Sequence, residues 1–113
     1  MKVNQRDIVL INFPFSDLSG AKVRPALVIS NQTYNVKNLD TVVLALTSNL
    51  SASDYKIFVS NQDLESGQLP VKSAIRADKP FSVLQSKILK VQAKILVVKF
   101  DEVQTAIAQL IDG

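Results

Sequence analysis

The chain of 113 residues contains no cysteine and no histidine. The lack of cysteine excludes a disulfide framework and a thiolate nucleophile, and the lack of both residues excludes a Cys/His zinc site. Without histidine as a general base, any catalysis has to rely on Asp, Glu, Lys, Arg, Tyr, Ser or Thr. The sequence also has no glycine-rich phosphate loop and no cluster of carboxylates, so we expect chemistry that needs no metal.

Long hydrophobic runs are also missing from the sequence. The longest, such as residues 42–46 and 95–98, fall far short of the ~20 residues that span a bilayer, so no membrane span is expected. Residues 1–13 show no basic segment followed by a long apolar stretch and a cleavage site. We therefore expect no secretion signal and a cytoplasmic location.

The overall composition is typical of a folded domain. Hydrophobic residues make up 47% of the chain and charged residues 20%, which provides enough apolar side chains for a core. At this length, and without a Gly/Ser/Pro-rich linker, we expect a single domain over residues 1–113. The net charge of +3 and the pI of about 9.3 suit a polyanionic partner, although many basic proteins bind none.

Short β-branched runs, separated by Asn, Asp, Gly and Pro, predict a small barrel of five or six strands. Residues 7–13 are the first strand. Residues 24–30 are the second, with Pro25 at its first position because proline cannot donate to a central ladder. Residues 41–47 are the third, and the change to polar residues at Thr47 marks the rim of a sheet. Further strands are expected at residues 55–60, 73–78 and 86–91.

Two other segments differ in character from these strands. The connection over residues 14–23 is longer than a tight turn requires, and long connections often carry function. Residues 101–112 are expected to be helical, with Asp101 and Gln104 as a capping pair. Apolar residues there recur at spacings of three and four, which gives a stripe that either packs on the barrel or binds a partner.

Arginine is scarce, with only Arg6, Arg24 and Arg76 among 13 basic residues. Arginine is preferred where a planar fork has to bind phosphate or carboxylate, whereas lysine acts as a mobile, solvated charge. Arg24 and Arg76 therefore either bind an anionic ligand or form ordinary surface salt bridges and packed stems.

Polar residues near these arginines could support chemistry. Arg76 and Asp78 are two residues apart in a strand, so their side chains leave the same face roughly 6 to 7 Å apart. They form either a local ion pair or a carboxylate kept ionised as a proton acceptor beside a phosphate clamp. The hydroxyls of Thr47 and Ser48 either bind phosphate or cap the end of a strand.

Three phenylalanines could stack on nucleobases, since aromatic faces add about 1 to 3 kcal/mol per base in single-strand binding. Phe13 is expected in the core, as such residues more often are. For Phe15, inside the long connection, both roles stay open, and Phe81 is the third candidate.

Residues 7–13, DIVLINF, and residues 20–31, GAKVRPALVISN, resemble the opening of the MazF/PemK family of toxins from toxin–antitoxin modules. Leu46-Thr47-Ser48 is similar to the Thr-Ser of that family's third strand. Arg76-Ala77-Asp78 is similar to the Arg-x-Asp element of its PemK/Kid branch. The chain departs from the family at Arg6, where members often have glycine, and in residues 15–22.

The resemblance implies a mainly β fold with a C-terminal helix, an SH3-like small barrel of the MazF/PemK/CcdB type that forms a homodimer. It implies an endoribonuclease that cleaves single-stranded RNA without metal or cofactor, and that inhibits growth until a cognate antitoxin protein binds. Arg24 and Thr47 match essential family residues, and Arg76 with Asp78 matches the acid–base pair of the PemK branch. Ser48, Phe15 and Lys22 are expected to bind substrate.

RNA cleavage by its own 2′-hydroxyl requires the proton of that hydroxyl to be removed, the charge on the phosphorane oxygens to be stabilised and the departing 5′-oxygen to be helped. Asp78 is the plausible base in a chain without histidine. Arg24 can clamp the phosphate and Thr47 can donate to the same oxygens. Because a guanidinium gives up protons reluctantly, we expect Arg76 to stabilise the leaving oxygen by its charge. A 2′,3′-cyclic phosphate product and resistance to EDTA follow.

Two alternatives remain at this stage. A DNA gyrase poison of the CcdB kind would share the barrel, but that family relies on a C-terminal tryptophan and this chain has no tryptophan. The second alternative is a non-catalytic barrel that binds nucleic acid or peptide, which applies if the candidate residues do not converge.

Overall fold

A computed structural model describes residues 2–14 and 21–113. Within these residues, seven strands form one antiparallel sheet in the order β4-β6-β3-β2-β1-β7-β5. The strands are β1 (Asp7–Pro14), β2 (Ala21–Val28), β3 (Asp40–Thr47), β4 (Lys56–Val59), β5 (Leu64–Gly67), β6 (Ser73–Leu84) and β7 (Ile88–Ile95). The α-helices are α1 (Gln32–Lys37) and α2 (Val97–Asp112), with short 3-10 turns at Asn61–Asp63 and Gln85–Lys87.

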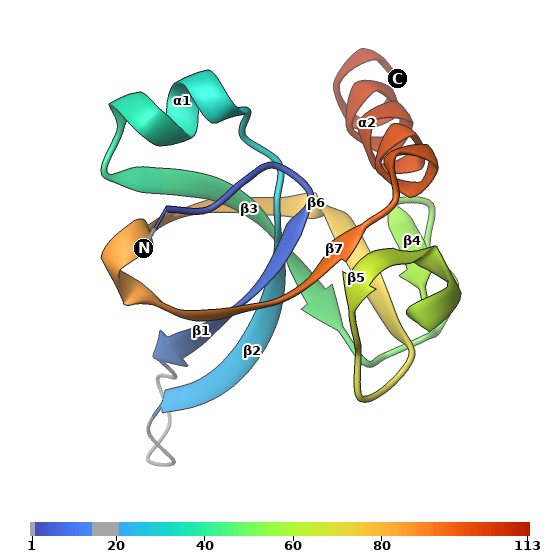
Figure 1. Cartoon of the computed structure of the whole chain (residues 1–113). Coiled ribbons are helices and arrows are strands. Elements are labelled where there is room, and N and C mark those ends of the chain that lie inside the picture. The colour runs from blue at the N-terminus through green and yellow to red at the C-terminus, as the bar shows by residue number, and fades with distance from the viewer. Residues whose placement is uncertain (1, 15–20) are drawn as a thin grey trace.

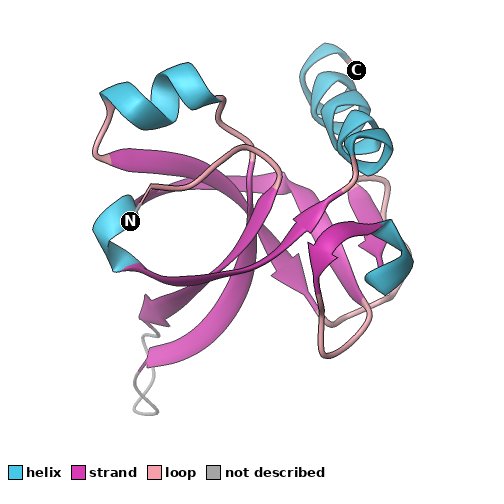
Figure 2. Cartoon of the chain, in the orientation of Figure 1, coloured by secondary structure: helices cyan, strands magenta, loops and turns pink. Residues whose placement is uncertain are grey.

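The sheet curls into a half-barrel (Figure 1). In the view of Figure 2 both α-helices lie away from the β1–β2 hairpin. The predicted fold class, mainly β with a C-terminal helix and a small SH3-like barrel, is confirmed in this half-barrel form. No helix within the described ranges is both long and apolar enough to cross a membrane.

The curled sheet has apolar side chains on both faces, because successive residues of a strand point to opposite sides. The first cluster lies between the sheet and α2 and includes Leu27, Leu46, Ile75 and Phe100. Its helical members are Phe100, Val103 and Ala106, so the predicted packing of the helix stripe on the barrel is confirmed.

A second cluster occupies the opposite face of the central strands. Its members are Val3, Val9, Ile11, Ala26, Val28, Val43 and Ile88, with Phe13, Phe81 and Val83 packed against them. The rings of Phe13 and Phe81 lie 5.2 Å apart at 56°, an arrangement that favours edge-to-face aromatic contact. Phe13 therefore packs on the core as expected.

The predicted start of the second strand is wrong. β2 begins at Ala21 rather than at residue 24, and its ladder with β1 runs from Ala21 to Leu27. Pro25 consequently lies inside the strand and not at its first position. The fold tolerates it because the ladder between β2 and β3 covers only Ala26 to Val28 and stops next to the proline. Of the predicted connection, residues 15–20 lie outside the described part.

The C-terminal helix also begins earlier than predicted. α2 starts at Val97 with Leu96 as its N-cap and without a side-chain cap. Asp101 therefore lies in the helix interior, and the predicted capping pair with Gln104 is wrong. The apolar residues 95–98 gave no polar signal for the helix start.

The sequence prediction missed α1 and β5. It ended β6 at residue 78 instead of Leu84, and it set β7 at residues 86–91 instead of Ile88–Ile95. Buried amides secure the region around α1. The carboxamide Oδ1 of Asn35 accepts from the hydroxyls of Ser30 (2.6 Å) and Thr41 (2.8 Å). Nε2 of Gln85 donates to the carbonyls of Asn35 (2.8 Å) and Asn38 (3.0 Å). These contacts join residues far apart in the chain, so local sequence patterns do not reveal them.

Strand β6 contains a large bulge. Leu46 pairs with Ile75 and Leu44 pairs with Pro80, so residues 76–79 of β6 lie opposite the single residue Ala45. A bulge bends its strand and changes the direction of the side chains that it carries. The bulge holds the whole Arg-x-Asp element.

Candidate active site

The register of three strands brings three of the four candidate catalytic residues, Arg24, Thr47 and Arg76, to one face of the sheet. Thr47, the last residue of β3, pairs with Ala74 of β6. Arg76 is two residues beyond Ala74 and therefore points to the same side. Ala26 pairs with Ala45, and Arg24 and Thr47 each lie two residues from that pair, so their side chains point to the same side as well.

These residues line a pocket of about 290 Å³, which we call the front pocket. Its lining residues are Phe13, Arg24, Ala45, Leu46, Thr47, Arg76 and Lys79. Ala45, with its small side chain, lies on β3, the strand between those that carry the two arginines. Three cationic side chains around one hydroxyl make the front pocket suitable for a phosphate group.

The Arg76–Asp78 pair lies in the bulge beside the front pocket. Nη2 of Arg76 donates to Oδ2 of Asp78 at 3.3 Å, with side chains 33% and 25% exposed. Nε of Arg76 and Oδ1 of Asp78 are buried without a hydrogen-bond partner in the described part of the chain. Buried polar atoms are normally partnered, so this unsatisfied donor and acceptor mark the pair as an unusual feature that a functional role would explain.

The ionisation of Asp78 results from opposing effects. Burial is the largest of them and raises the pKa of Asp78. The hydrogen bond and the charge of Arg76, a hydrogen bond from the backbone and the charge of Lys79 together lower that pKa below its usual value. Asp78 is therefore a carboxylate at neutral pH and can accept a proton.

The hydroxyl of Thr47 caps the end of its strand, one of the two roles that the sequence left open. Its Oγ1 accepts from the backbone N–H of Asn49 at 3.1 Å, which fixes the turn after β3, and its hydrogen can still be donated. Lys56 steadies the same loop, because its Nζ donates to the carbonyls of Asn49 and Ser51, both at 3.1 Å.

The predicted substrate-binding residues Lys22 and Ser48 lie at a second pocket of about 330 Å³, the back pocket. It shares Arg24, Leu46 and Thr47 with the front pocket. Both Lys22 and Ser48 are exposed. Phe15 lies outside the described residues. The lining residues are Leu10, Lys22, Val23, Arg24, Pro25, Leu46, Thr47, Ser48, Leu69, Pro70, Val71, Ser73 and Gln92.

Two residues of this region were missed from the sequence. Lys79 lines the front pocket. Phe58 pairs with Ala74, the residue that also pairs with Thr47, so Phe58 and Thr47 share one face of the sheet. Its ring is 39% exposed. The alternation in β4 could have revealed it, since Ile57 and Val59 are buried and Phe58 has to point the other way.

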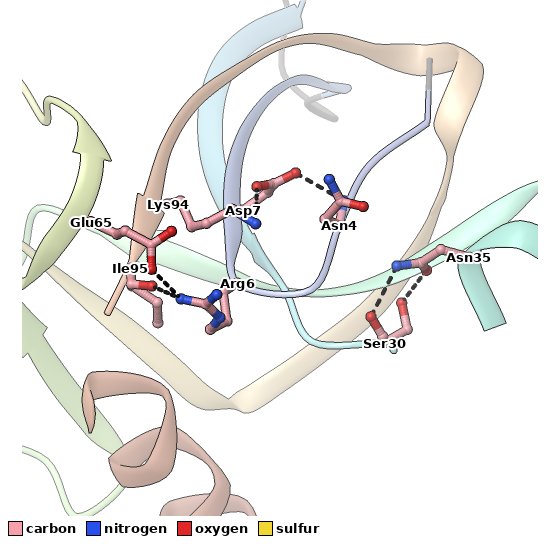
Figure 3. A network of polar contacts seen from close by, with 8 residues as sticks. All are labelled: Asn4, Arg6, Asp7, Ser30, Asn35, Glu65, Lys94 and Ile95. Atoms are coloured by element: carbon pink, nitrogen blue, oxygen red, sulfur yellow. Dashed lines mark hydrogen bonds and ion pairs between the residues drawn. The ribbon is translucent and has the colours of Figure 1, made fainter. Parts of the chain in front are cut away.

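The third arginine belongs to a different network (Figure 3). Nη1 of Arg6 donates to the carbonyl of Ile95 at 2.7 Å and to Oε1 of Glu65 at 3.1 Å. Nearby, the buried carboxylate of Asp7 accepts from the backbone N–H of Asn4 at 2.9 Å. Arg6 thus joins the strand ends of β1, β5 and β7. The described residues contain no group of three metal-ligating side chains.

A half-barrel whose rim carries two arginines, a threonine and an ionised aspartate has the charge and the hydrogen-bond donors to bind a phosphate group. The family model of PemK-like, MazF-like toxins of type II toxin–antitoxin systems matches residues 4–111. The chain belongs to that family.

Solved structures with the same fold include MazE-MazF from Deinococcus radiodurans, with 21% identity, a TM-score of 0.80, and coverage of 99% of this chain and 98% of that one. An endoribonuclease in complex with its cognate antitoxin, from mycobacterial species, has 18% identity and a TM-score of 0.77 over 97% and 95% of the two chains. Mycobacterium tuberculosis toxin MazF-mt6 has 15% identity and a TM-score of 0.76 over 95% and 97%. No curated protein matches the sequence.

Proposed function

We propose that the chain is a metal-independent endoribonuclease toxin that cleaves single-stranded RNA at specific sequences and is neutralised by a cognate antitoxin. The observation that carries this proposal is the front pocket, where Arg24, Thr47 and Arg76 surround one space and Asp78 is held against Arg76. Structures with the same fold are described as endoribonucleases and as MazE-MazF complexes, which supports the same activity here.

In the proposed reaction, Asp78 removes the proton of the 2′-hydroxyl, and the resulting oxygen attacks the neighbouring phosphorus. Arg24 and Thr47 stabilise the charge on the phosphorane oxygens through hydrogen bonds. The bond to the 5′-oxygen then breaks, Arg76 stabilises that oxygen by its charge, and water supplies its proton while protonated Asp78 returns its own proton to the hydroxide that forms. The products are a 2′,3′-cyclic phosphate and a 5′-hydroxyl end.

The remaining residues are assigned to substrate binding. Lys22 and Ser48 contact the RNA backbone from the back pocket, and Phe15 stacks on a base. Phe58 offers a second aromatic face beside Thr47, and exposed aromatic rings are common platforms for single-stranded RNA.

The biological setting follows from the proposed activity. The 113 residues act as one domain and work in the cytoplasm as a homodimer. An acidic segment of the antitoxin folds across the cationic front pocket and excludes RNA. A CcdB-like role in binding gyrase is not favoured, since the family match is to PemK-like, MazF-like toxins.

Substitution of Arg24 tests the proposal. Arg24→Ala should lower the rate of single-stranded RNA cleavage by about 10²- to 10³-fold, the usual effect of losing one donor to a developing oxyanion. Circular dichroism should show an unchanged fold. Lys37→Ala, which removes an exposed cation on α1, is the matched control and should cleave normally. A wild-type chain that binds RNA without cleaving it would instead support the non-catalytic alternative.

A further inference from the structure

The sheet is split between β2 and β3 at the rim. Beyond the pair Ala26 and Ala45, β2 continues along β1 as far as Ala21, and β3 continues along β6 as far as Thr47. The two strands are not paired with each other over this stretch. Pro25 lies where the ladder ends and has no N–H to continue it.

Both pockets open at this split. Arg24, Leu46 and Thr47 line the front pocket and the back pocket alike. The front pocket adjoins the second cluster through Phe13, whereas the back pocket reaches the first cluster through Leu46 and Leu69. A phosphate bound by Arg24 and Thr47 would therefore have access to a cavity on each face of the sheet.

The back pocket has the composition of a site for a flat, partly apolar group. Its walls include Leu10, Val23, Pro25 and Val71. Lys22 and Arg24 supply positive charge at the split, and its described lining contains no carboxylate. Positive charge beside apolar walls suits an anionic chain that also carries flat, partly apolar groups, as single-stranded RNA does.

One polar side chain in this pocket is available for recognition. The carboxamide of Gln92 has no hydrogen-bond partner in the described ranges, whereas the hydroxyl of Ser73 already donates to the carbonyl of Val71 at 3.2 Å. A carboxamide presents a donor and an acceptor together and can pair with the polar edge of a base.

We propose that the back pocket binds an unstacked nucleobase next to the cleaved phosphodiester and that Gln92 reads the edge of that base. The proposal rests on the proposed ribonuclease function and deepens it. Single-stranded RNA is commonly recognised through splayed bases held by apolar side chains and hydrogen-bonded at their edges. Gln92 is then a residue that determines specificity, not one that acts in the chemical step.

The first test is the sequence preference of cleavage. Wild type and Gln92→Leu are incubated with a randomised single-stranded RNA library, and the new 5′ ends are sequenced. We expect the base preference at one position beside the cleaved bond to change about tenfold, with cleavage itself retained. Gln104→Leu, on exposed α2 surface, is the matched control and should keep the wild-type preference.

The second test pairs the residue with the base. Oligonucleotides with one abasic nucleotide at each position near the cleaved bond, and a 2′-deoxy group at that bond, are titrated by fluorescence anisotropy. Removal of the recognised base should weaken binding to wild type about tenfold and should have little further effect on Gln92→Leu.

The outcomes separate the two proposals. If wild type does not cleave RNA, the proposed function fails. If wild type cleaves but Gln92→Leu keeps its base preference, the nucleobase assignment of the back pocket is overturned. The assignment is also overturned if removal of the base and replacement of Gln92 weaken oligonucleotide binding additively. A Gln92→Leu variant altered only in dimer formation or antitoxin binding would likewise overturn it and indicate a protein occupant.

Discussion

At the scale of single residues, Asp78 depends most on its neighbour Arg76. Burial alone would raise the pKa of Asp78, and the adjacent guanidinium reverses that effect. The spacing of two residues in a strand was enough to predict that the two side chains share a face. Their position inside a bulge, and the burial of one unpartnered atom on each, depend on pairing with β3 and could not be predicted locally.

Removing the guanidinium should therefore raise the pKa of Asp78. In Arg76→Gln, burial persists while the hydrogen bond and the positive charge are lost. Carboxyl chemical shifts followed by NMR against pH would give the value directly. Lys79→Gln is the matched comparison and should cause a smaller rise, because Lys79 contributes least to the lowering.

The same shift has a consequence for stability. Because the pKa of Asp78 is lowered in the folded chain, ionised Asp78 stabilises the fold at pH values above its unfolded-state pKa. This stabilisation is lost as the pH falls through the folded-state pKa. In Arg76→Gln this contribution should disappear from the pH dependence of unfolding. An unchanged pKa of Asp78 in that variant would contradict the account.

Arg6 is a second residue whose role depends on its backbone. Its φ of 79° lies in the left-handed region, where side chains with a Cβ are strained and glycine is not. Its N–H donates to the carbonyl of Val28 at 2.9 Å, and its carbonyl accepts from the N–H of Ile95 at 3.1 Å, which fixes this conformation. Glycine, which has no Cβ, would adopt this conformation without strain.

Two substitutions separate the strain from the side-chain contacts. Arg6→Ala should lower the free energy of unfolding by about 1 to 2 kcal/mol, because the bond to the carbonyl of Ile95 is lost and the strain is kept. Arg6→Gly loses the same bond but relieves about 1 kcal/mol of strain, so it should be the more stable of the two. Urea unfolding measures both, and a glycine variant less stable than the alanine variant would refute the strain argument.

At the scale of elements, short β-branched runs located most of the strands, and strand alternation offered a further signal that was not used. Applied to β4, where Ile57 and Val59 are buried, it would have revealed that Phe58 points the other way. Strand ends were predicted less well, because the end of a ladder depends on the neighbouring strand. The first pairs of β2 are made with β1 alone, and its start at Ala21 reflects that partner.

Phe58 provides a direct probe of RNA on β4. The chain has no tryptophan, so Phe58→Trp introduces a single fluorescent reporter on the face that also carries Thr47. Binding of an uncleavable single-stranded oligonucleotide should quench this fluorescence, since bases stack on aromatic rings. Val98→Trp, on exposed surface of α2, is the control and should not respond. Equal responses at both positions would argue against stacking on β4.

At the scale of the whole molecule, the sequence predicted the fold class and the candidate residues but not their arrangement around a split sheet. Arg24 and Thr47 are 23 positions apart in the chain. Both line the front pocket and the back pocket, because β2 and β3 are neighbouring strands whose pairing ends at Ala26. The curl of the sheet and the two pockets result from long-range pairing. The family match to residues 4–111 accounts for why the resemblance of short motifs extended to the whole fold.

The most direct test of the central claim is cleavage of an RNA whose 2′-hydroxyl at the cleaved nucleotide is replaced by hydrogen, compared with the intact RNA, with EDTA present in both reactions. The account predicts that the intact RNA is cut in EDTA to a 2′,3′-cyclic phosphate end, because Arg24, Thr47, Arg76 and Asp78 supply the whole chemistry. It predicts that the 2′-deoxy substrate is not cut. Cleavage of the 2′-deoxy substrate, or loss of activity on chelation, would contradict it.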